Sequence, residues 1–190
     1  MSGADKHFIS AQQLLVDSFK LADLIYRSNF RPHFIVGLWR GGAPIGIAVQ
    51  EYFEYRHLPT NHIAVRTSSY RGIDDASTTI AVHGLHYLIE HCRSDESLLI
   101  VDDVFDSGRS VLAVIEQIRV NAGDNTPHDI RIACPWYKPA RRQVPQVPDY
   151  FLHQSDKWLV FPHELQGLSR DEIRDGKPEL ASIQSLFDRA

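Results

Sequence analysis

The stretch LLIVDDVFDSGRSV, residues 98–111, brings three aspartates and two serines close together in the chain. The four apolar residues at 98–101 predict a buried strand, and Asp102 and Asp103 stand at its end. Adjacent carboxylates repel each other and raise each other's pKa. Such a pair is typical of a site that binds a cation, ligand hydroxyls, or both.

The residues after the acid pair form a small polar segment that leads into a helix. Four apolar residues have helical spacing: Val111, Val114, Ile115 and Ile118. Gly123 is placed to end this helix. A glycine-bearing loop at a helix N-terminus presents free backbone N–H groups, and the helix dipole favours an anion there. The sequence therefore predicts a phosphorylated ligand that also carries hydroxyls or a metal ion.

Strands and helices alternate along the rest of the chain. Strands are predicted at 33–38, 62–67, 78–82, 98–101 and 129–137, with an edge strand at 151–155. Helices are predicted after the Ser10–Gln13 capping box, from Pro44 to about Tyr55, over 111–122 and after the Ser169–Glu172 capping box. Residues 83–92 fit a short helix or a loop, and 68–77 fit a polar loop. This alternation predicts a parallel sheet with helices on both faces.

Four polar loops follow predicted strands: WRGG, SSYRG, DDVFDSGRS and KPARR. In open α/β sheets, ligands bind outside the carboxyl ends of the strands, so these loops are expected to share one rim. They would gather five cations there: Arg40, Arg66, Arg71, Arg109 and Lys138. The site is therefore expected to be basic, which suits a polyanionic ligand, although the net charge of the chain is −4.

The composition is that of an ordinary soluble protein. The chain has 190 residues, of which 43% are hydrophobic and 23% charged. Its net charge gives no general attraction to nucleic acid or membrane surfaces, so neither is expected as a partner. Two cysteines provide no disulfide framework, and neither a signal region nor a membrane-spanning run is visible. We expect a cytoplasmic protein.

The sequence resembles type I phosphoribosyltransferases over roughly residues 33–164. LLIVDDVFDSGRSV resembles their motif for phosphoribosyl pyrophosphate (PRPP), with Ser107 and Ser110 where threonine is common. IVGLWRGGAPIG resembles the pyrophosphate loop, VRTSSYRG the mobile loop of purine-salvage members, and YKP with DKWLVFPHE the base-binding hood of 6-oxopurine members. The resemblance implies the type I fold, an α/β domain with a mostly parallel twisted sheet, flanking helices and a small hood. We expect one domain over residues 1–190, with its hood mainly at about 138–165 and N-terminal contributions.

The resemblance implies how PRPP and its leaving group would be held. Asp102 and Asp103 would accept hydrogen bonds from the ribose hydroxyls and help to hold Mg²⁺, the expected cofactor. The 5-phosphate would lie in a cradle of consecutive residues: Asp106, Ser107, Gly108, Arg109 and Ser110. Arg40 and Gly41 would bind pyrophosphate, after a Trp39–Arg40 peptide bond that is often cis in the family.

Other residues are implied in base binding and catalysis. Asp106 would repel phosphate, which suggests a second task, and the resemblance gives it the purine N7 as general base or hydrogen-bond partner. Lys138 would donate to the purine O6, Trp158 would stack on the base, and the backbone at Leu159 would read its far edge. Trp158 also fits a core aromatic. Three further residues complete the implied set: Glu164 for a second Mg²⁺, and Ser69 and Tyr70 as a lid over the reacting centre.

The implied reaction transfers the phosphoribosyl group of PRPP to hypoxanthine, guanine or xanthine, giving a purine nucleotide and pyrophosphate. Two alternatives stay open: transfer to another base, and a non-catalytic regulatory or RNA-binding protein with the same fold. The sequence does not rank the three purines. Family members commonly form dimers or tetramers, so a homo-oligomer is expected. His83, His86 and His91 give only a weak zinc pattern.

Overall fold

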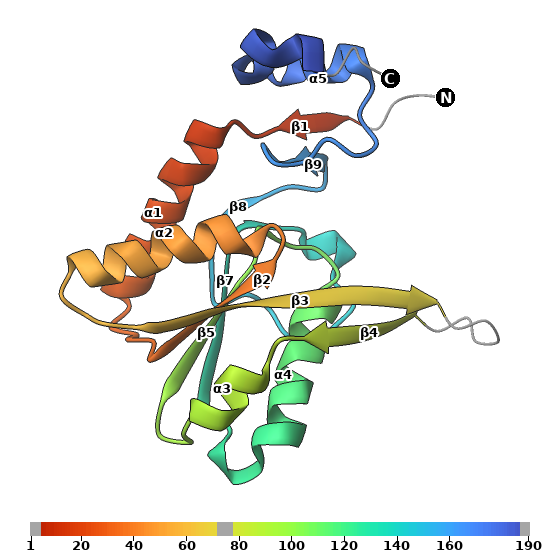
Figure 1. Ribbon diagram of the computed structural model, residues 1–190. Helices are drawn as coiled ribbons and strands as arrows, with labels where there is room; N and C mark the ends of the chain where they lie inside the picture. The colour runs from red at the N-terminus through yellow and green to blue at the C-terminus, as the bar shows by residue number, and fades with distance from the viewer. Residues whose placement is uncertain (1–4, 72–77, 187–190) are drawn as a thin grey trace. The chain divides into compact units, whose positions relative to one another are not determined.

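The computed structural model describes residues 5–71 and 78–186 of the chain. The chain divides into two units (Figure 1). One unit, here called the terminal unit, consists of Met1–Val16 and Lys157–Ala190. The other, here called the sheet unit, is Asp17–Asp156. The first helix, α1 (Ala11–Arg27), begins in the terminal unit and ends in the sheet unit.

The sheet unit is built on a seven-stranded sheet with the order β4-β3-β2-β5-β7-β6, and β8 also pairs with β7. The strands are β2 (Phe34–Trp39), β3 (Asn61–Arg71), β4 (Thr78–His83), β5 (Ser97–Val101), β6 (Val104–Phe105), β7 (Asp129–Tyr137) and β8 (Tyr150–Gln154). Only the β3–β4 pair is antiparallel among the described strands of this sheet. The predicted mostly parallel α/β fold is confirmed.

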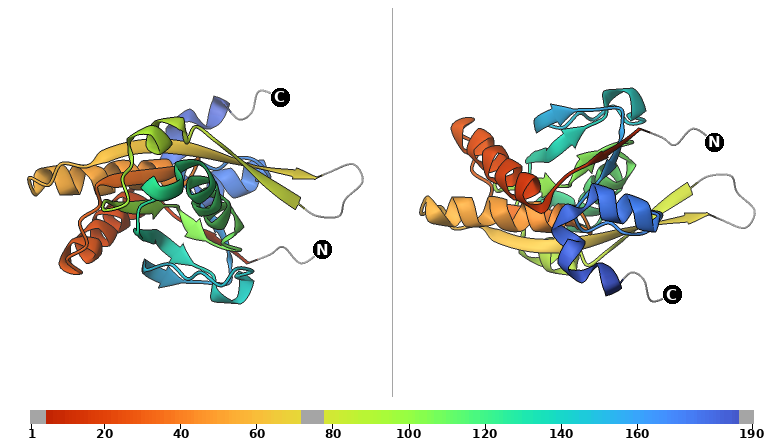
Figure 2. Two further views of the ribbon diagram at one scale, coloured as in Figure 1. Left: turned by 90° about the horizontal axis from the view of Figure 1, so that it is seen from below. Right: turned by 90° about the horizontal axis from the view of Figure 1, so that it is seen from above.

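Helices cover both faces of this sheet, as the views from below and above show (Figure 2). α2 (Gly42–Tyr55) lies on one face, and α3 (His86–His91) and α4 (Arg109–Ala122) lie on the other (Figure 1). α4 buries the apolar stripe that the sequence predicts, and this stripe packs in one core with Val36, Leu98 and Ile100 of the central strands. Strands buried on both faces explain the continuous apolar runs at 34–38 and 98–101.

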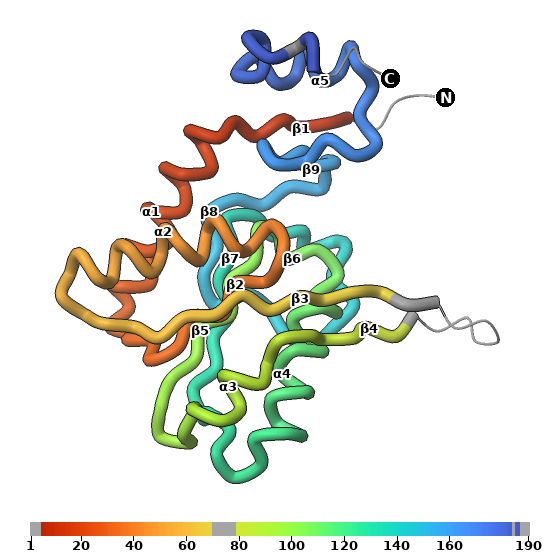
Figure 3. The backbone as a smooth tube through the Cα atoms, viewed as in Figure 1, coloured from red at the N-terminus to blue at the C-terminus, as the bar shows by residue number. Residues whose placement is uncertain are grey.

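The terminal unit joins the two ends of the chain. β1 (Lys6–Phe8) pairs in parallel with β9 (Trp158–Val160), and Figure 3 traces the two segments side by side. α5 (Arg170–Gly176) begins at the predicted capping box, in which Ser169 and Glu172 bind each other's backbone N–H groups. A 3₁₀ segment, Pro178–Leu186, follows.

Most predicted elements are confirmed within one or two residues, but the hairpin of β3 and β4 differs from the prediction. The loop predicted at 68–77 is wrong over 68–71, because β3 continues to Arg71 and pairs with Thr78–Ala81 of β4. Antiparallel pairing with the β-branched run at 78–80 stabilises this extension. The remainder of that predicted loop, 72–77, lies outside the described residues. Three very short strands, β1, β6 and β9, were not predicted.

A membrane span would need a long helix that is apolar along its length. None of the helices within 5–71 and 78–186 meets both conditions.

Candidate active site

The acid pair lies where β5 ends, as the sequence predicts. Asp102 N–H donates to the Ala133 carbonyl of the neighbouring strand at 3.1 Å. Asp103 N–H then donates to Asp102 Oδ1 at 3.0 Å, and Val104 N–H donates to Asp103 Oδ1 at 2.8 Å. Each carboxylate is therefore fixed by the backbone of the residue that follows it.

This arrangement is electrostatically costly without a ligand. Burial raises the pKa of Asp102 well above its usual value, and the charge of Asp103 raises it further. A cation or several hydroxyl donors would stabilise the ionised pair. The carboxylate oxygens are hard ligands of the kind that Mg²⁺ prefers, so the residues present fit this ion.

The loop between β2 and α2 packs directly on the acid pair. Its Trp39–Arg40 peptide bond is cis, a feature that is common in the family the sequence resembles and that the sequence alone left open. A Cβ atom on Gly41 would overlap the Asp103 carboxyl group and lie 2.8 Å from its Oδ1. A Cβ atom on Gly42 would overlap the Val101 carbonyl. Only glycine permits this approach, which brings the predicted pyrophosphate loop against the predicted ribose-binding acids.

A small pocket of about 70 Å³ lies between the acid pair and the start of α4. Four of the five residues of the predicted phosphate cradle line it: Asp106, Ser107, Gly108 and Ser110. The rest of the lining comes from Asp102, Val104, Phe105 and Val111. Gly108 has a φ of 77°, which favours glycine, and it caps α4 so that the first N–H groups of the helix belong to this loop. The Arg109 side chain lines a different hollow, between α4 and β4. The Arg109 side chain is therefore not among the residues that line the pocket beside the acid pair.

Asp106 lies beside two cations. Its Oδ1 is 3.0 Å from Arg141 Nε, and its Oδ2 is 3.7 Å from Lys138 Nζ. Lys138 is only 5% exposed, whereas the Arg141 side chain is 56% exposed. These cations offset the repulsion that the sequence analysis expects between Asp106 and a bound phosphate.

Backbone hydrogen bonds fix this cluster from both sides. Lys138 N–H donates to the Phe105 carbonyl at 2.9 Å, and Gln143 N–H donates to the Ser107 carbonyl at 3.0 Å. The pairing of β6 with β7 brings these two segments together. Sequence analysis missed Arg141, although the KPARR loop that it singled out contains this residue.

The other predicted site residues lie in different surroundings. Ser69 is exposed and lies in β3, opposite Ile80, not in a loop. The backbone of Tyr70 pairs with Thr79, and its side chain lies outside the described part of the structure. Arg40 is exposed on the loop after β2.

The predicted hood residues after position 157 belong to the terminal unit. Trp158 is 57% exposed, so it is not a core aromatic, and Leu159 is buried. Glu164 accepts a hydrogen bond from Phe161 N–H at 3.1 Å through Oε2. Their roles toward a base or a metal ion stay predictions.

The three histidines noted in the sequence do not form a metal site. Within the described residues, no group of three or more histidines, cysteines or acids is placed to hold a metal ion. Each histidine has another neighbour: Ser68 for His83, Glu90 for His86, and Tyr87 for His91.

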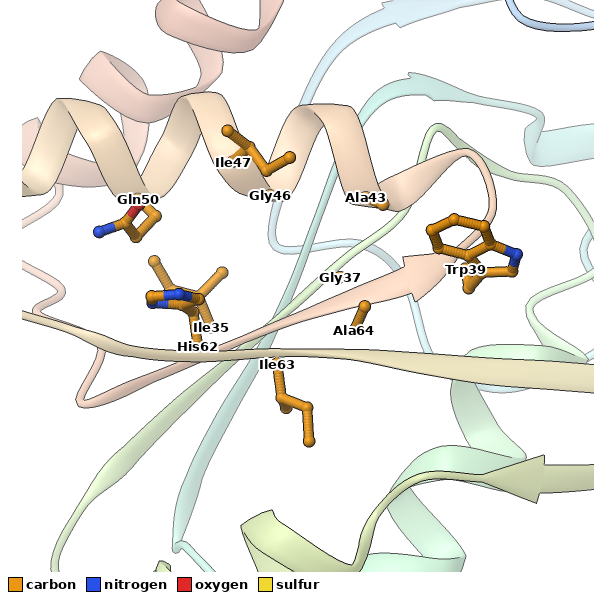
Figure 4. Close-up of a pocket in the computed structure, with 10 residues that line it drawn as sticks. All are labelled: Ile35, Gly37, Trp39, Ala43, Gly46, Ile47, Gln50, His62, Ile63 and Ala64. Atoms are coloured by element: carbon orange, nitrogen blue, oxygen red, sulfur yellow. The ribbon is translucent and has the colours of Figure 1, made fainter.

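A larger apolar pocket of about 380 Å³ lies on the other face of the sheet (Figure 4). α2, β2 and β3 enclose it, with Ile47 and Gln50 from the helix and His62 from β3 among its lining. Trp39 lies at one end of it, directly before Arg40. None of the predicted site residues lines this pocket, so the volume of a pocket does not by itself identify the candidate active site.

Comparison with known proteins decides the family. A model of the phosphoribosyl transferase domain matches residues 10–168. The chain belongs to this family. The predicted resemblance to phosphoribosyltransferases is therefore confirmed.

Solved structures with this phosphoribosyl transferase fold include a purine phosphoribosyltransferase from Pyrococcus horikoshii, 27% identical, with a TM-score of 0.66 over 87% of this chain and 97% of that one. Helicobacter pylori xanthine-guanine-hypoxanthine phosphoribosyltransferase is 19% identical, with a TM-score of 0.64 over 82% and 92% of the two chains. A hypothetical protein from Neisseria gonorrhoeae with bound ppGpp is 17% identical, with a TM-score of 0.71 over 96% and 99%. The last two likenesses show the shared fold alone. No curated protein sequence matches the chain.

Proposed function

We propose that this phosphoribosyl transferase domain transfers the 5-phosphoribosyl group from PRPP to a 6-oxopurine, giving the purine nucleotide and pyrophosphate in purine salvage. The observation that carries this proposal is the pair formed by Asp106 and Lys138. An acceptor, Asp106 Oδ2, lies 3.7 Å from a donor, Lys138 Nζ, beside the phosphate cradle. The two groups form an ion pair at a distance longer than a hydrogen bond, so a ligand atom could bind each of them more closely than they bind each other.

The pair complements one edge of a 6-oxopurine. Such a base carries O6 next to N7, and when N7 is protonated this edge offers an acceptor beside a donor. Lys138 would donate to O6 while Asp106 accepts the N7 proton or a hydrogen bond from N7–H. Adenine carries an amino group in place of O6, so its donor would face the Lys138 ammonium. This mismatch favours hypoxanthine, guanine or xanthine over adenine.

The remaining residues around the pocket suit PRPP. Backbone N–H groups and the hydroxyls of Ser107 and Ser110 would bind the 5-phosphate, and Asp102 and Asp103 would bind the ribose hydroxyls. Bond breaking at the sugar would pass through an oxocarbenium-like state, as in glycoside chemistry. The chain would then contribute mainly by positioning the reactants and excluding water. A Mg²⁺ ion held with the acid pair would neutralise charge on the departing pyrophosphate.

The pyrophosphate loop and the hood complete the proposal. Arg40 and the backbone of Gly41 would bind pyrophosphate. Trp158 would stack on the base, and its exposure supports a role in ligand contact. Leu159 would read the far edge of the ring through its backbone. One domain over residues 1–190 with a hood at about 138–165 is part of this proposal.

The remaining expectations are proposals of the same kind. Ser69 and Tyr70 would close over the reacting centre from β3. Glu164 would help to hold a second metal ion. The protein would act as a homo-oligomer in the cytoplasm, without nucleic-acid or membrane partners.

Pyrophosphate release from PRPP with a panel of bases tests the proposal. We expect release with at least one of hypoxanthine, guanine and xanthine, and little with adenine or orotate. Release with adenine or orotate alone would favour the alternative of another base. PRPP binding without release for any base would favour the non-catalytic alternative.

A further inference from the structure

The second cation beside Asp106 has no part in the chemistry proposed above. We infer that Arg141 is a positioning residue, which holds the Asp106 carboxylate so that Oδ2 faces Lys138 and the incoming base. This inference rests on the proposed function, because it concerns the residue that would accept from N7. It adds a residue that the family-like motifs of the sequence do not include.

The backbone on both sides of Asp106 is already fixed. Phe105 and Ser107 accept hydrogen bonds from Lys138 N–H and Gln143 N–H. These bonds hold the Cα atom of Asp106 but leave its side chain free to rotate. A carboxylate that must meet one atom of a base needs a second restraint on the side chain itself.

The distances identify Arg141 as that restraint. Its Nε is 3.0 Å from Asp106 Oδ1, within the usual range of a charged contact, whereas Lys138 Nζ is 3.7 Å from Oδ2. The Lys138 contact is longer, so it holds the carboxylate less tightly than the Arg141 contact does. With Oδ1 held by the guanidinium, Oδ2 is the oxygen left toward the buried lysine.

The position of Arg141 is itself set by the fold. It lies on the 3₁₀ turn Pro139–Arg141, and its N–H donates to the Lys138 carbonyl at 3.1 Å. Lys138 directly precedes this turn, so one short segment carries both cations to the carboxylate. Because the Arg141 side chain is 56% exposed, its ion pair contributes little to folding free energy. Its contribution would appear in turnover.

A kinetic cycle tests this inference with PRPP and the preferred 6-oxopurine. We expect Arg141→Ala to lower kcat by about tenfold, as a misplaced group would, with the KM for PRPP unchanged. Arg141→Lys should recover most of the loss because it restores a donor and a charge. In the Asp106→Asn background, Arg141→Ala should cause no further loss, since the carboxylate that it positions is gone. The unfolding midpoint of Arg141→Ala should match that of the wild type.

Arg142 provides the matched control. It carries the same charge one residue further along, and its Nη1 donates to the carbonyls of Val144 and Pro145 at 2.7 and 3.0 Å. Any loss of kcat in Arg142→Ala would come from disturbing the loop whose carbonyls Arg142 binds. That loss should be equally large with and without the Asp106→Asn substitution.

Two results would overturn the inference while leaving the proposed function intact. A raised KM for PRPP with normal kcat in Arg141→Ala would make Arg141 a phosphate ligand. If Arg141→Ala lowered kcat as much in the Asp106→Asn background as in the wild type, Arg141 would act independently of Asp106. A wild-type protein that releases pyrophosphate with none of the bases would refute the proposed function, and this inference with it.

Discussion

A single methyl group on the pyrophosphate loop should impair PRPP binding more than it impairs folding. In Gly41→Ala the new Cβ would overlap the Asp103 carboxyl group, which must rotate away. The rotation breaks the 2.8 Å hydrogen bond from Val104 N–H to Asp103 Oδ1. Because the displaced atoms end a flexible side chain, the loss of folding stability should be about 1 kcal/mol, the value of one hydrogen bond.

The effect on the ligand should be larger. A carboxylate that binds ribose hydroxyls contributes about 1.5–3 kcal/mol per charged hydrogen bond. Its loss corresponds to roughly a 10- to 150-fold rise in the Kd for PRPP. Calorimetry with PRPP and Mg²⁺ measures this change, and thermal unfolding measures stability on the same samples.

Two other glycines of the same segment provide matched controls. In Gly42→Ala the Cβ would meet backbone, the Val101 carbonyl and the Asp102 Cα at 2.9 Å, so stability should fall by about 3 kcal/mol or more. In Gly46→Ala the nearest atom, Gly37 Cα, is 3.5 Å away, so stability should rise by about 0.5–1 kcal/mol and PRPP binding should not change. Wild-type PRPP affinity in Gly41→Ala would refute the packing of this loop on Asp103.

Three further predictions follow from the site and the core. Replacing both Asp102 and Asp103 by Asn should abolish Mg²⁺-dependent PRPP binding measured by calorimetry, and unchanged affinity would refute their assignment. If Trp158 stacks on the base, adding a purine nucleotide should change the tryptophan fluorescence of the protein. Trp158→Phe should remove most of that change and leave PRPP binding intact. An undiminished change in the variant would mean that another tryptophan gives the signal. Burial raises the pKa of the Cys92 and Cys134 thiols, so neither should react with a thiol reagent at pH 8 until the protein is unfolded; rapid labelling of the native protein would contradict their burial.

The convergence of distant loops was predictable because it follows from the direction of the strands. β2, β5 and β7 run parallel, so the loops after them meet at one edge of the sheet. The structure accordingly brings Gly41 against Asp103, and Asp106 beside Lys138. Apolar runs and capping residues were sufficient to predict this part of the fold from the sequence.

Other contacts have no local signal in the sequence. The ion pair of Arg141 with Asp106 depends on the backbone bonds that fix β6 beside β7, and β6 has only two residues. β1 and β9 have three residues each and come from opposite ends of the chain, so neither has a pattern of its own. Residues 68–71 have the composition of a polar loop. They are extended because they pair with β4, and their own sequence carries no signal for a strand.

The most direct test of the central claim is the turnover of Asp106→Asn with hypoxanthine and with its analogue that carries carbon at position 7. The substitution keeps the shape of the side chain and removes its charge. We predict a fall in kcat of about 10²- to 10⁴-fold on hypoxanthine, the usual contribution of general acid–base catalysis, with PRPP affinity unchanged or improved. The analogue should bind poorly to the wild type and show little further loss in the variant. Near-normal turnover of Asp106→Asn on hypoxanthine and guanine would contradict the assignment of Asp106 to the purine N7, and with it the main support for a 6-oxopurine substrate.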